Sequence, residues 1–323
     1  MTEVDIIRLF TQPFRRSEHQ LNAPFECDAE LLRIGDETWA YSIDDFSPEE
    51  DLFTSDNPQR LGANLVTATL SDLLAAGAEP RFFMHALTLP PDAGIEFIQG
   101  LRDGICATLE QADCTLCGGD LGCGPTWRYS GFAMGPAVRP LTRKLPDTST
   151  ALWVTGQLGD ANLAALLQAP TPAFELRLQE AAVIRKYATG CIDTSGGLMD
   201  ALWNLHDINP HLRIELHRER VPLAEGLSSI GNMPPEAALV GGAGEYELLF
   251  ATPDLDAAAE AELVEMGMTR IAVVSTDNPG LFVHDRRVET PPPCPRSGES
   301  MENYIAEVIR YAVSAPHHVN LDE

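Results

Sequence analysis

The sequence predicts a two-domain α/β (α+β) protein. Strand-like and helix-like segments alternate through the first half, as in a sheet covered by helices. The chain has 323 residues, 44% of them hydrophobic, enough for one large or two ordinary domains with real cores. The segment "RPLTRKLPDTST", 139–150, is polar and proline-bearing without an apolar period. We therefore predict domains at 1–141 and 142–323.

The first half contains two helical patterns between strand-like runs. Apolar spacing predicts a helix over 59–76, which Gly77 can end in the left-handed conformation. Prolines are expected to start a second helix over roughly 91–111. Strands are predicted in "TWAYSI" (38–43), "RFFMHALTL" (81–89), "TLCGG" and "WRYSGFAMGPAV".

The second half restarts with a strand and ends with a helix. Strands are predicted in "ALWVTG", "EYELLFATP" and "RIAVVSTD". Helices are predicted in "QLGDANLAALLQ", "FELRLQEAAVIRKYA", "GLMDALWNLHDI" and, after the proline-rich linker "ETPPPCPRSGES", over about 299–313.

Charge and cysteine content narrow the function classes. The formal net charge is -26, and only Lys144 and Lys186 are lysines, which argues against binding nucleic acid through its phosphates. No window approaches the ~20 apolar residues of a membrane span, and the first residues have no long apolar run. Seven cysteines, an odd number, suggest reduced thiols. We expect a cytoplasmic protein without a membrane or nucleic-acid partner.

One acid interrupts a buried helix. In "VTATLSDLLAAGAEPR", 66–81, apolar residues surround Asp72 on nearly every side. A carboxylate in such surroundings is costly unless it is paired or bound to a metal. Further acids stand at strand ends or turns, several of them beside glycine: Asp28, Asp44, Asp45, Asp120 and Asp193.

Scattered aspartates have two interpretations. Asp and Gly are ordinary turn formers. Alternatively, Mg²⁺ uses one or two carboxylates together with substrate phosphates, so its ligands need not form a compact motif. The sequence contains neither G-x-x-x-x-G-K-[ST] nor a G-x-G-x-x-G after a strand, so the standard phosphate-binding loops are missing.

An ordered set of motifs resembles thiamine-monophosphate kinases. The motifs are "TLSDLLAAGAEPRFFMHALTLPPD", "LCGGDLGCGP", "LTRKLPDTSTALWVTGQLGDANLAAL", "CIDTSGGLMDAL" and "ALVGGAGEYELLFATP". This family belongs to the ATP-binding superfamily of aminoimidazole ribonucleotide (AIR) synthetase and selenophosphate synthetase. The resemblance implies an N-terminal sheet domain that pairs with a second subunit, a larger C-terminal α/β domain, and ATP with Mg²⁺ between the domains. It therefore implies a homodimer acting on a small-molecule acceptor.

The resemblance also implies roles for individual residues. Asp72 matches an acid that bridges several magnesium ions, and Arg143 an arginine on ATP. No catalytic residue is assigned. The implied magnesium ligands are Asp28, Ser42, Ile43, Asp44, Asp72, Asp120 and Asp193; the nucleotide contacts are Gly119, Asp120, Arg143 and Ser195; the acceptor contacts are Asp45 and Glu245.

The chain departs from the family pattern mainly on the acceptor side. Gly196 replaces an aspartate of "DISDGL", and Gly244 a glutamate of "GGGEDYELLF". Glu245 could substitute, although a shift of one residue on a strand would reverse its face. Thr69 replaces asparagine in "NLSD", "SPEEDLF" replaces "VEGVHF", and no tryptophan follows Trp203. These changes suggest a changed acceptor.

Three functions follow from these observations. The leading one is an ATP- and Mg²⁺-dependent phosphotransferase with direct attack of an acceptor oxygen on the γ-phosphate. The second is an ATP-dependent synthetase or dehydratase that activates a carbonyl or amide oxygen. The third is a nucleotide-binding homologue without turnover, suggested by the two glycines. The cysteines Cys114, Cys117 and Cys123 are interpreted as free thiols, and Cys27 could be a reactive thiol only as a minor alternative.

Overall fold

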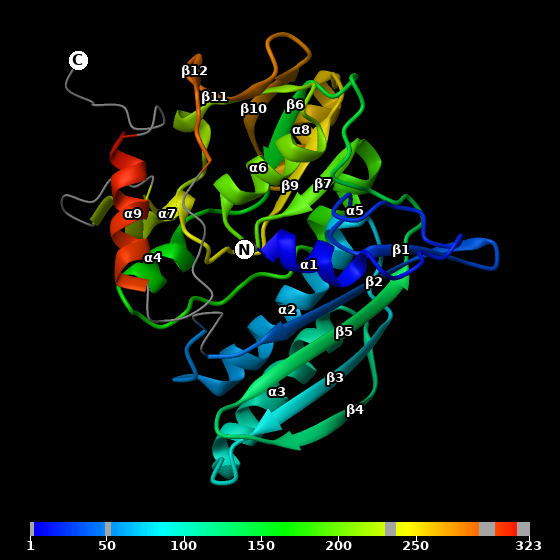
Figure 1. Ribbon diagram of the computed structural model, residues 1–323, viewed down its shortest axis with the longest axis vertical. Coiled ribbons are helices and arrows are strands. Elements are labelled where there is room, and N and C mark those ends of the chain that lie inside the picture. The colour runs from blue at the N-terminus through cyan, green and yellow to red at the C-terminus, as the bar shows by residue number, and fades with distance from the viewer. Residues whose placement is uncertain (1–2, 49–52, 230–236, 291–300, 315–323) are drawn as a thin grey trace.

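The computed structural model describes residues 3–48, 53–229, 237–290 and 301–314. Its strands form two separate sheets, drawn one above the other in Figure 1. The order in the first sheet is β1 (Glu30–Ile34), β2 (Glu37–Phe46), β5 (Arg128–Pro136), β3 (Phe82–Leu89), β4 (Thr115–Cys123). The order in the second is β12 (Arg286–Arg287), β11 (Gly280–Val283), β8 (Arg213–Leu216), β10 (Thr269–Ser275), β6 (Ala151–Val154), β9 (Leu248–Thr252), β7 (Gly190–Asp193).

Two helices cover one face of the first sheet. They are α2 (Pro58–Ala75) and α3 (Ile95–Gln111), and glycines allow their close approach. A Cβ at Gly62 would lie 2.2 Å from the carbonyl oxygen of Leu101, and one at Gly104 only 1.9 Å from that of Gln59. Any side chain at either position would therefore push the helices apart.

Helix α2 is the central element of the molecule. Proline occupies its first turn, the Asn57 side chain accepts a hydrogen bond from the Arg60 amide (3.0 Å), and Gly77 follows its end with φ +73°. The predicted glycine end is therefore confirmed. Its buried residues share one hydrophobic cluster with strands of both sheets, so a continuous core joins the two halves of the chain.

The second sheet is covered on both faces. Along β9, Leu248 and Phe250 belong to the core shared with α2, whereas Leu249 and Ala251 belong to a second core. Helices α5 (Leu178–Tyr187) and α8 (Ala257–Glu265) contribute to the first core, and α6 (Leu198–Ile208), α7 (Ala237–Val240) and α9 (Met301–Ser314) to the second. The remaining helices are α1 (Glu3–Thr11), α4 (Asp160–Leu166), η1 (Arg218–Arg220) and η2 (Glu225–Ser229).

The segment 137–150 runs from the first sheet to the second. Asn209, after α6, holds it: its Oδ1 accepts the Leu145 amide and its Nδ2 donates to the carbonyl oxygen of Arg143, each at 2.8 Å. The α/β class expected from the sequence is confirmed. The division at residues 141 and 142 stays a prediction.

Several element boundaries differ from the prediction. The helix expected from residue 91 begins at Ile95, because Pro90 and Pro91 lie in the preceding turn. The strand expected from Glu245 begins only at Leu248, and Tyr246 has φ +59°. The final linker and part of "SPEEDLF" (47–53) lie outside the described residues. Among the helices of the described chain, none has the length and apolar character needed to cross a bilayer.

Candidate active site

Three predicted acids from distant parts of the sequence meet at one point. Asp28 precedes β1, Asp72 lies in the last turns of α2, and Asp193 ends β7. One carboxylate oxygen from each lies within 4.8 Å of the others. We call these three residues the acid cluster. It is the arrangement expected of a site that holds a hard cation.

Neighbouring hydroxyl groups position two of these carboxylates. Ser42 donates from Oγ to Oδ2 of Asp72 (2.5 Å), and Ser71 donates from Oγ to Oδ2 of Asp193 (2.7 Å). The Ser195 amide also donates to Oδ1 of Asp193 (3.2 Å), so the turn after β7 helps to hold the Asp193 carboxylate in place. Ser195 itself is exposed, which leaves its hydroxyl free to meet a ligand.

Arg143 provides the positive charge beside the acid cluster. Its Nη2 donates to Oδ1 of Asp28 (2.6 Å), while its main-chain amide donates to the carbonyl oxygen of Glu26 (2.7 Å). The Asp28 side chain is only 1% exposed. Burial raises its pKa to about 6, against the opposing influence of Arg143.

Electrostatic repulsion is concentrated at Asp72. Burial raises the pKa of its carboxyl well above the ordinary value, and the neighbouring charges of Asp44, Asp193 and Asp28 raise it further. Oδ2 of Asp28 is buried without a hydrogen-bond partner among the described residues. Four acids and one arginine leave an excess of negative charge, so the donor set suits a divalent cation.

The first sheet separates the predicted site residues into two groups. Side chains alternate along a strand, so Ser42 and Asp44 face α2, whereas Ile43 and Asp45 face the open side. In the strand register, Asp120 lies opposite Ala86 and Ala86 lies opposite Ser130. Ser130 in turn lies opposite Asp45, so all four side chains are on one face of the sheet. Asp120 therefore lies on the open face, and within one chain the structure does not bring it to the acid cluster.

Of the other predicted site residues on this sheet, Ile43 and Asp45 lie on the open face and Gly119 lies on the α2 side. Ile43 is 71% exposed, so only its main-chain oxygen could meet a metal. Asp45 accepts a hydrogen bond from Ser130 (2.5 Å) and lies 3.4 Å from Arg128. It is not among the residues that line the cavity described below. Gly119 pairs with His85 on the α2 side, where a Cβ would meet the histidine ring at 2.4 Å.

A cavity of about 430 Å³ lies beside α4, and Glu245 lines it. Oε1 of Glu245 accepts hydrogen bonds from the amides of Gly159 (2.9 Å) and Ala161 (3.0 Å), at the start of α4. Burial raises the pKa of this carboxyl to about 7. Because residues 244–247 form a loop and not a strand, the expected reversal of face does not apply.

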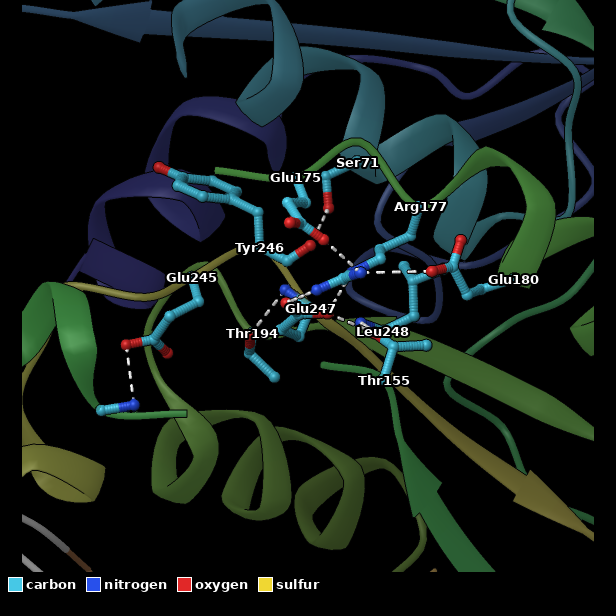
Figure 2. Close-up of polar contacts among 11 residues, drawn as sticks. Ser71, Thr155, Glu175, Arg177, Glu180, Thr194, Glu245, Tyr246, Glu247 and Leu248 are labelled. Carbon is cyan, nitrogen blue, oxygen red and sulfur yellow. Dashed lines mark hydrogen bonds and ion pairs between the residues drawn. The ribbon is translucent and has the colours of Figure 1, made fainter. Parts of the chain in front are cut away.

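Next to Glu245, a buried ion pair forms the cavity wall. Arg177 donates from Nε and Nη2 to both carboxylate oxygens of Glu247 (2.7 and 2.6 Å), and Thr155 donates to the same carboxylate. Glu175 and Glu180 also contact Arg177, as Figure 2 shows. Sequence reasoning missed Arg177 and Glu247. The only local signal was an acid inside the apolar run "YELLF".

The two glycine replacements differ in their surroundings. A Cβ at Gly244 would lie 1.7 Å from the carbonyl oxygen of Thr194 and 2.5 Å from that of Ser195, so main chain fills the space of a side chain. A Cβ at Gly196 would meet only the Asp200 carboxylate, at 2.4 Å. That is the end of a flexible side chain, which can move away.

The cysteines have no part in this site. Burial raises the pKa of the Cys27 thiol to about 12, so the thiolate required of a nucleophile is not populated. Cys114 is buried, whereas Cys117 and Cys123 are exposed on β4. Among the described residues they form no group with metal-ligand spacing.

Comparisons with known proteins agree with this fold and motif order. The family model "AIR synthase related protein, N-terminal domain" matches residues 26–137. The thiamine-monophosphate kinase of Escherichia coli K12 is 29% identical over 317 residues, covering 88% of this chain and 94% of that protein. That of Synechococcus elongatus is 30% identical over 223 residues, covering 61% and 67%.

A solved structure extends the comparison to three dimensions. "AaThiL complexed with AMPPCP and TMP" superposes with a TM-score of 0.74 at 23% identity, covering 91% of this chain and 95% of that one. This similarity shows the fold, and the curated relatives supply the family. The chain belongs to the thiamine-monophosphate kinase family of AIR synthase-related proteins and is an enzyme of the phosphotransferase class.

Proposed function

We propose that the chain transfers the γ-phosphoryl group of ATP to a small-molecule acceptor in a Mg²⁺-dependent reaction, and that thiamine monophosphate is not its preferred acceptor. The observation that carries the first part is the acid cluster, in which three carboxylates converge with one buried arginine. The observation that carries the second is the main chain that fills the side-chain space at Gly244.

Asp28, Asp72 and Asp193 are the residues that would hold Mg²⁺, with Asp44 and Ser42 beside them. The buried, unpartnered Oδ2 of Asp28 supports this assignment. Bound metal neutralises phosphate charge and orients the transferred group. Asp120 and the main-chain oxygen of Ile43 would join the site only through further ligands or a second subunit.

The chain's own residues supply positioning. Arg143 partly neutralises Asp28, and its guanidinium would bind a phosphate oxygen of the nucleotide, a contact that suits the planar arginine fork. The Ser195 hydroxyl and the Gly119 main chain are the other nucleotide contacts that we propose. Because phosphoryl transfer depends mainly on geometry and charge stabilisation, no general base is assigned.

The acceptor differs because two groups that the family uses are missing. Gly196 removes a carboxylate that would hold metal near an acceptor phosphate, and Gly244 removes a substrate-contacting glutamate. No tryptophan follows Trp203 to form an aromatic wall near the C-terminus. A smaller or less charged acceptor, with a hydroxyl, carboxylate or carbamoyl group, fits these losses.

We also propose a homodimer that pairs the open faces of the two first sheets. Large apolar side chains are exposed on this open face, namely Ile43, Phe82 and Met84. Single exposed apolar residues are normal, but a set of this size on one sheet indicates an interface. Pairing would also protect the exposed edge strand β4 from aggregation.

Steady-state kinetics with ATP, Mg²⁺ and thiamine monophosphate test the proposal. We expect kcat/KM below the ordinary range of roughly 10⁴ M⁻¹s⁻¹. A value in that range would show that Glu245 and the segment 47–53 rebuild the family pocket. ADP release with a panel of metabolites separates a kinase from a homologue without turnover. Free phosphate together with a dehydrated or cyclised product would indicate the synthetase chemistry instead.

A further inference from the structure

We infer that Asn162 is a positioning residue for the proposed nucleotide site. Its buried side-chain amide fixes residues 238–245, called here the glycine segment, and this segment holds residues 193–197, called here the Asp193 turn. The inference rests on the proposed function, because the turn carries Asp193 and Ser195, the proposed metal and nucleotide contacts. Asn162 lies on α4 and belongs neither to the acid cluster nor to the cavity wall.

The Asn162 amide bonds the glycine segment at two points. Its Nδ2 donates to the carbonyl oxygen of Ala238, and its Oδ1 accepts a hydrogen bond from the amide of Ala243, each at 2.8 Å. These two main-chain groups stand on either side of the end of α7, where carbonyl groups have no partner within the helix. One side chain therefore satisfies the end of α7 and closes the chain that follows it.

Burial makes this clamp strict. Asn162 is 2% exposed, so water cannot replace either hydrogen bond. A buried polar group that loses its partner is costly, and the amide of Asn162 has both its donor and its acceptor engaged. The glycine segment is thus held at the one position that satisfies both ends of the amide.

Glu245 provides a second anchor on the same helix. Its Oε1 accepts hydrogen bonds from the amides of Gly159 (2.9 Å) and Ala161 (3.0 Å), at the start of α4. Figure 2 shows Glu245 bonded in this way to main-chain nitrogen. Because Asn162 and Glu245 fix the glycine segment at both ends, it cannot shift relative to α4 without losing buried hydrogen bonds.

The glycine segment packs main chain against main chain on the Asp193 turn. A Cβ at Gly244 would lie 1.7 Å from the carbonyl oxygen of Thr194 and 2.5 Å from that of Ser195. At the other end of the turn, a Cβ at Gly197 would lie 2.7 Å from the carbonyl oxygen of Gly241. No side chain stands at these contacts to absorb a shift, so a displaced glycine segment would displace the turn.

The Asp193 turn in turn orients the site groups. The Ser195 amide donates to Oδ1 of Asp193 (3.2 Å), and the Gly197 amide donates to the carbonyl oxygen of Thr194 (2.8 Å). These bonds set the direction of the Asp193 carboxylate and the place of the Ser195 hydroxyl. Since phosphoryl transfer depends on such positioning, Asn162 should affect nucleotide binding through the turn.

Asn64 offers a matched control. It is also 2% exposed, its Nδ2 donates to the carbonyl oxygen of Pro172 (2.7 Å), and its Oδ1 accepts a hydrogen bond from the amide of Phe174 (3.0 Å). Asn64 therefore clamps a segment in the same manner, but that segment lines the cavity and does not include the Asp193 turn. Asn64→Ala removes an equivalent pair of hydrogen bonds elsewhere in the core.

Hydrogen exchange of the full chain, read by mass spectrometry on peptides that cover residues 190–200, tests the local effect. We expect exchange in the Asp193 turn to be at least tenfold faster in Asn162→Ala than in the parent, which corresponds to about 1.4 kcal/mol. Asn64→Ala should leave exchange in this turn near the parent value. Unchanged exchange in Asn162→Ala, or an equal increase in both variants, would overturn the inference.

Calorimetric titration with Mg²⁺–ATP on the same samples tests the effect on binding. We expect Asn162→Ala to bind Mg²⁺–ATP at least tenfold more weakly than the parent, and Asn64→Ala to differ from the parent by much less. General loss of stability would weaken binding equally in both variants, so equal losses would overturn the positioning role. Asn162→Asp keeps the acceptor for the Ala243 amide and should recover part of the affinity.

The two measurements separate this inference from the proposed function. Tight Mg²⁺–ATP binding that is the same in the parent and in Asn162→Ala would reject only the positioning role. Faster exchange in the turn of Asn162→Ala, in a parent that does not bind Mg²⁺–ATP, would reject only the proposed function. If Asn162→Ala does not fold, Asn162→Asp carries both comparisons, because an acidic residue is tolerated in the first turn of a helix.

Discussion

Arg143 and Asp28 form a buried ion pair, 2.6 Å between Nη2 and Oδ1, that ties the start of the chain to the segment between the two sheets. The sequence predicts a ligand contact for both residues, and in the structure each is also the other's ion-pair partner. The pair leaves Oδ2 of Asp28 without a partner among the described residues, and one carboxylate oxygen of Asp28 lies within 4.8 Å of one from Asp72 and one from Asp193. The acid cluster is therefore only partly neutralised by the protein, which agrees with the proposed cation site.

The first prediction concerns this cluster. Replacing Asp72 by Asn should lower the Mg²⁺-dependent affinity for ATP by about a hundredfold, or roughly 2.7 kcal/mol, because one metal-bridging carboxylate is lost. Titration calorimetry with Mg²⁺ and with excess chelator measures it. The exposed Asp254→Asn serves as the control. Unchanged affinity in Asp72→Asn, or equal affinity with chelator, would contradict the metal assignment.

The second prediction compares the two glycine replacements. Gly244→Glu should destabilise the chain by about 3 kcal/mol or more, because its Cβ would overlap the main chain of Thr194. Gly196→Asp should cost far less, since only the Asp200 side chain must move. Urea unfolding measures both, with Gly94→Ala, whose Cβ meets nothing within 4 Å, as the control. Equal stability of Gly244→Glu and the parent would show that the loop can move.

The third prediction concerns the cavity wall. Glu247→Gln should cost about 2 kcal/mol of unfolding free energy: the buried Arg177 loses its bidentate partner but retains Glu175 and Glu180. A double-mutant cycle with Arg177→Met should give a clear coupling energy. The exposed pair of Arg102 and Asp103 should show almost none. Additive effects in the buried pair would contradict this account.

A fourth prediction follows from the pKa of Glu245, which is raised from 4.5 to about 7 in the folded chain. Between these values the folded state binds more protons than the unfolded state, so the contribution of Glu245 to stability falls as pH rises through this window. Glu245→Gln removes that dependence. Its stability relative to the parent should therefore increase from about pH 5 to about pH 8 in urea unfolding. A pH-independent difference would show that the carboxyl titrates normally.

The fifth prediction concerns assembly. Light scattering should give a mass near twice the 35.1 kDa of the chain. Met84→Lys, at an exposed residue of β3 on the open face, should shift the mass toward that of the monomer without loss of helical signal. The control Val264→Lys changes an exposed apolar residue on α8 and should stay dimeric. A monomeric parent at micromolar concentration would contradict the proposed pairing.

The sequence by itself determined the class of fold, most elements and the acids of the site. Helix α2 is an example: a proline start, an unbroken apolar period and Gly77 at its end are local features, so its limits could be predicted closely. Asp72 was recognisable for the same reason, because a charge within an apolar helix stands out in the sequence alone.

Only the tertiary structure decided which residues meet. Asp120 was grouped with Asp72, but strand register places it on the opposite face of the first sheet, and register depends on pairing between strands far apart in sequence. Glu245 was expected on a strand, yet it lies in a loop where its carboxylate bonds to the start of α4, some 85 residues earlier. Arg177 and Glu247 could not be paired in advance, because a buried ion pair depends on three-dimensional proximity and leaves no periodic pattern in the sequence.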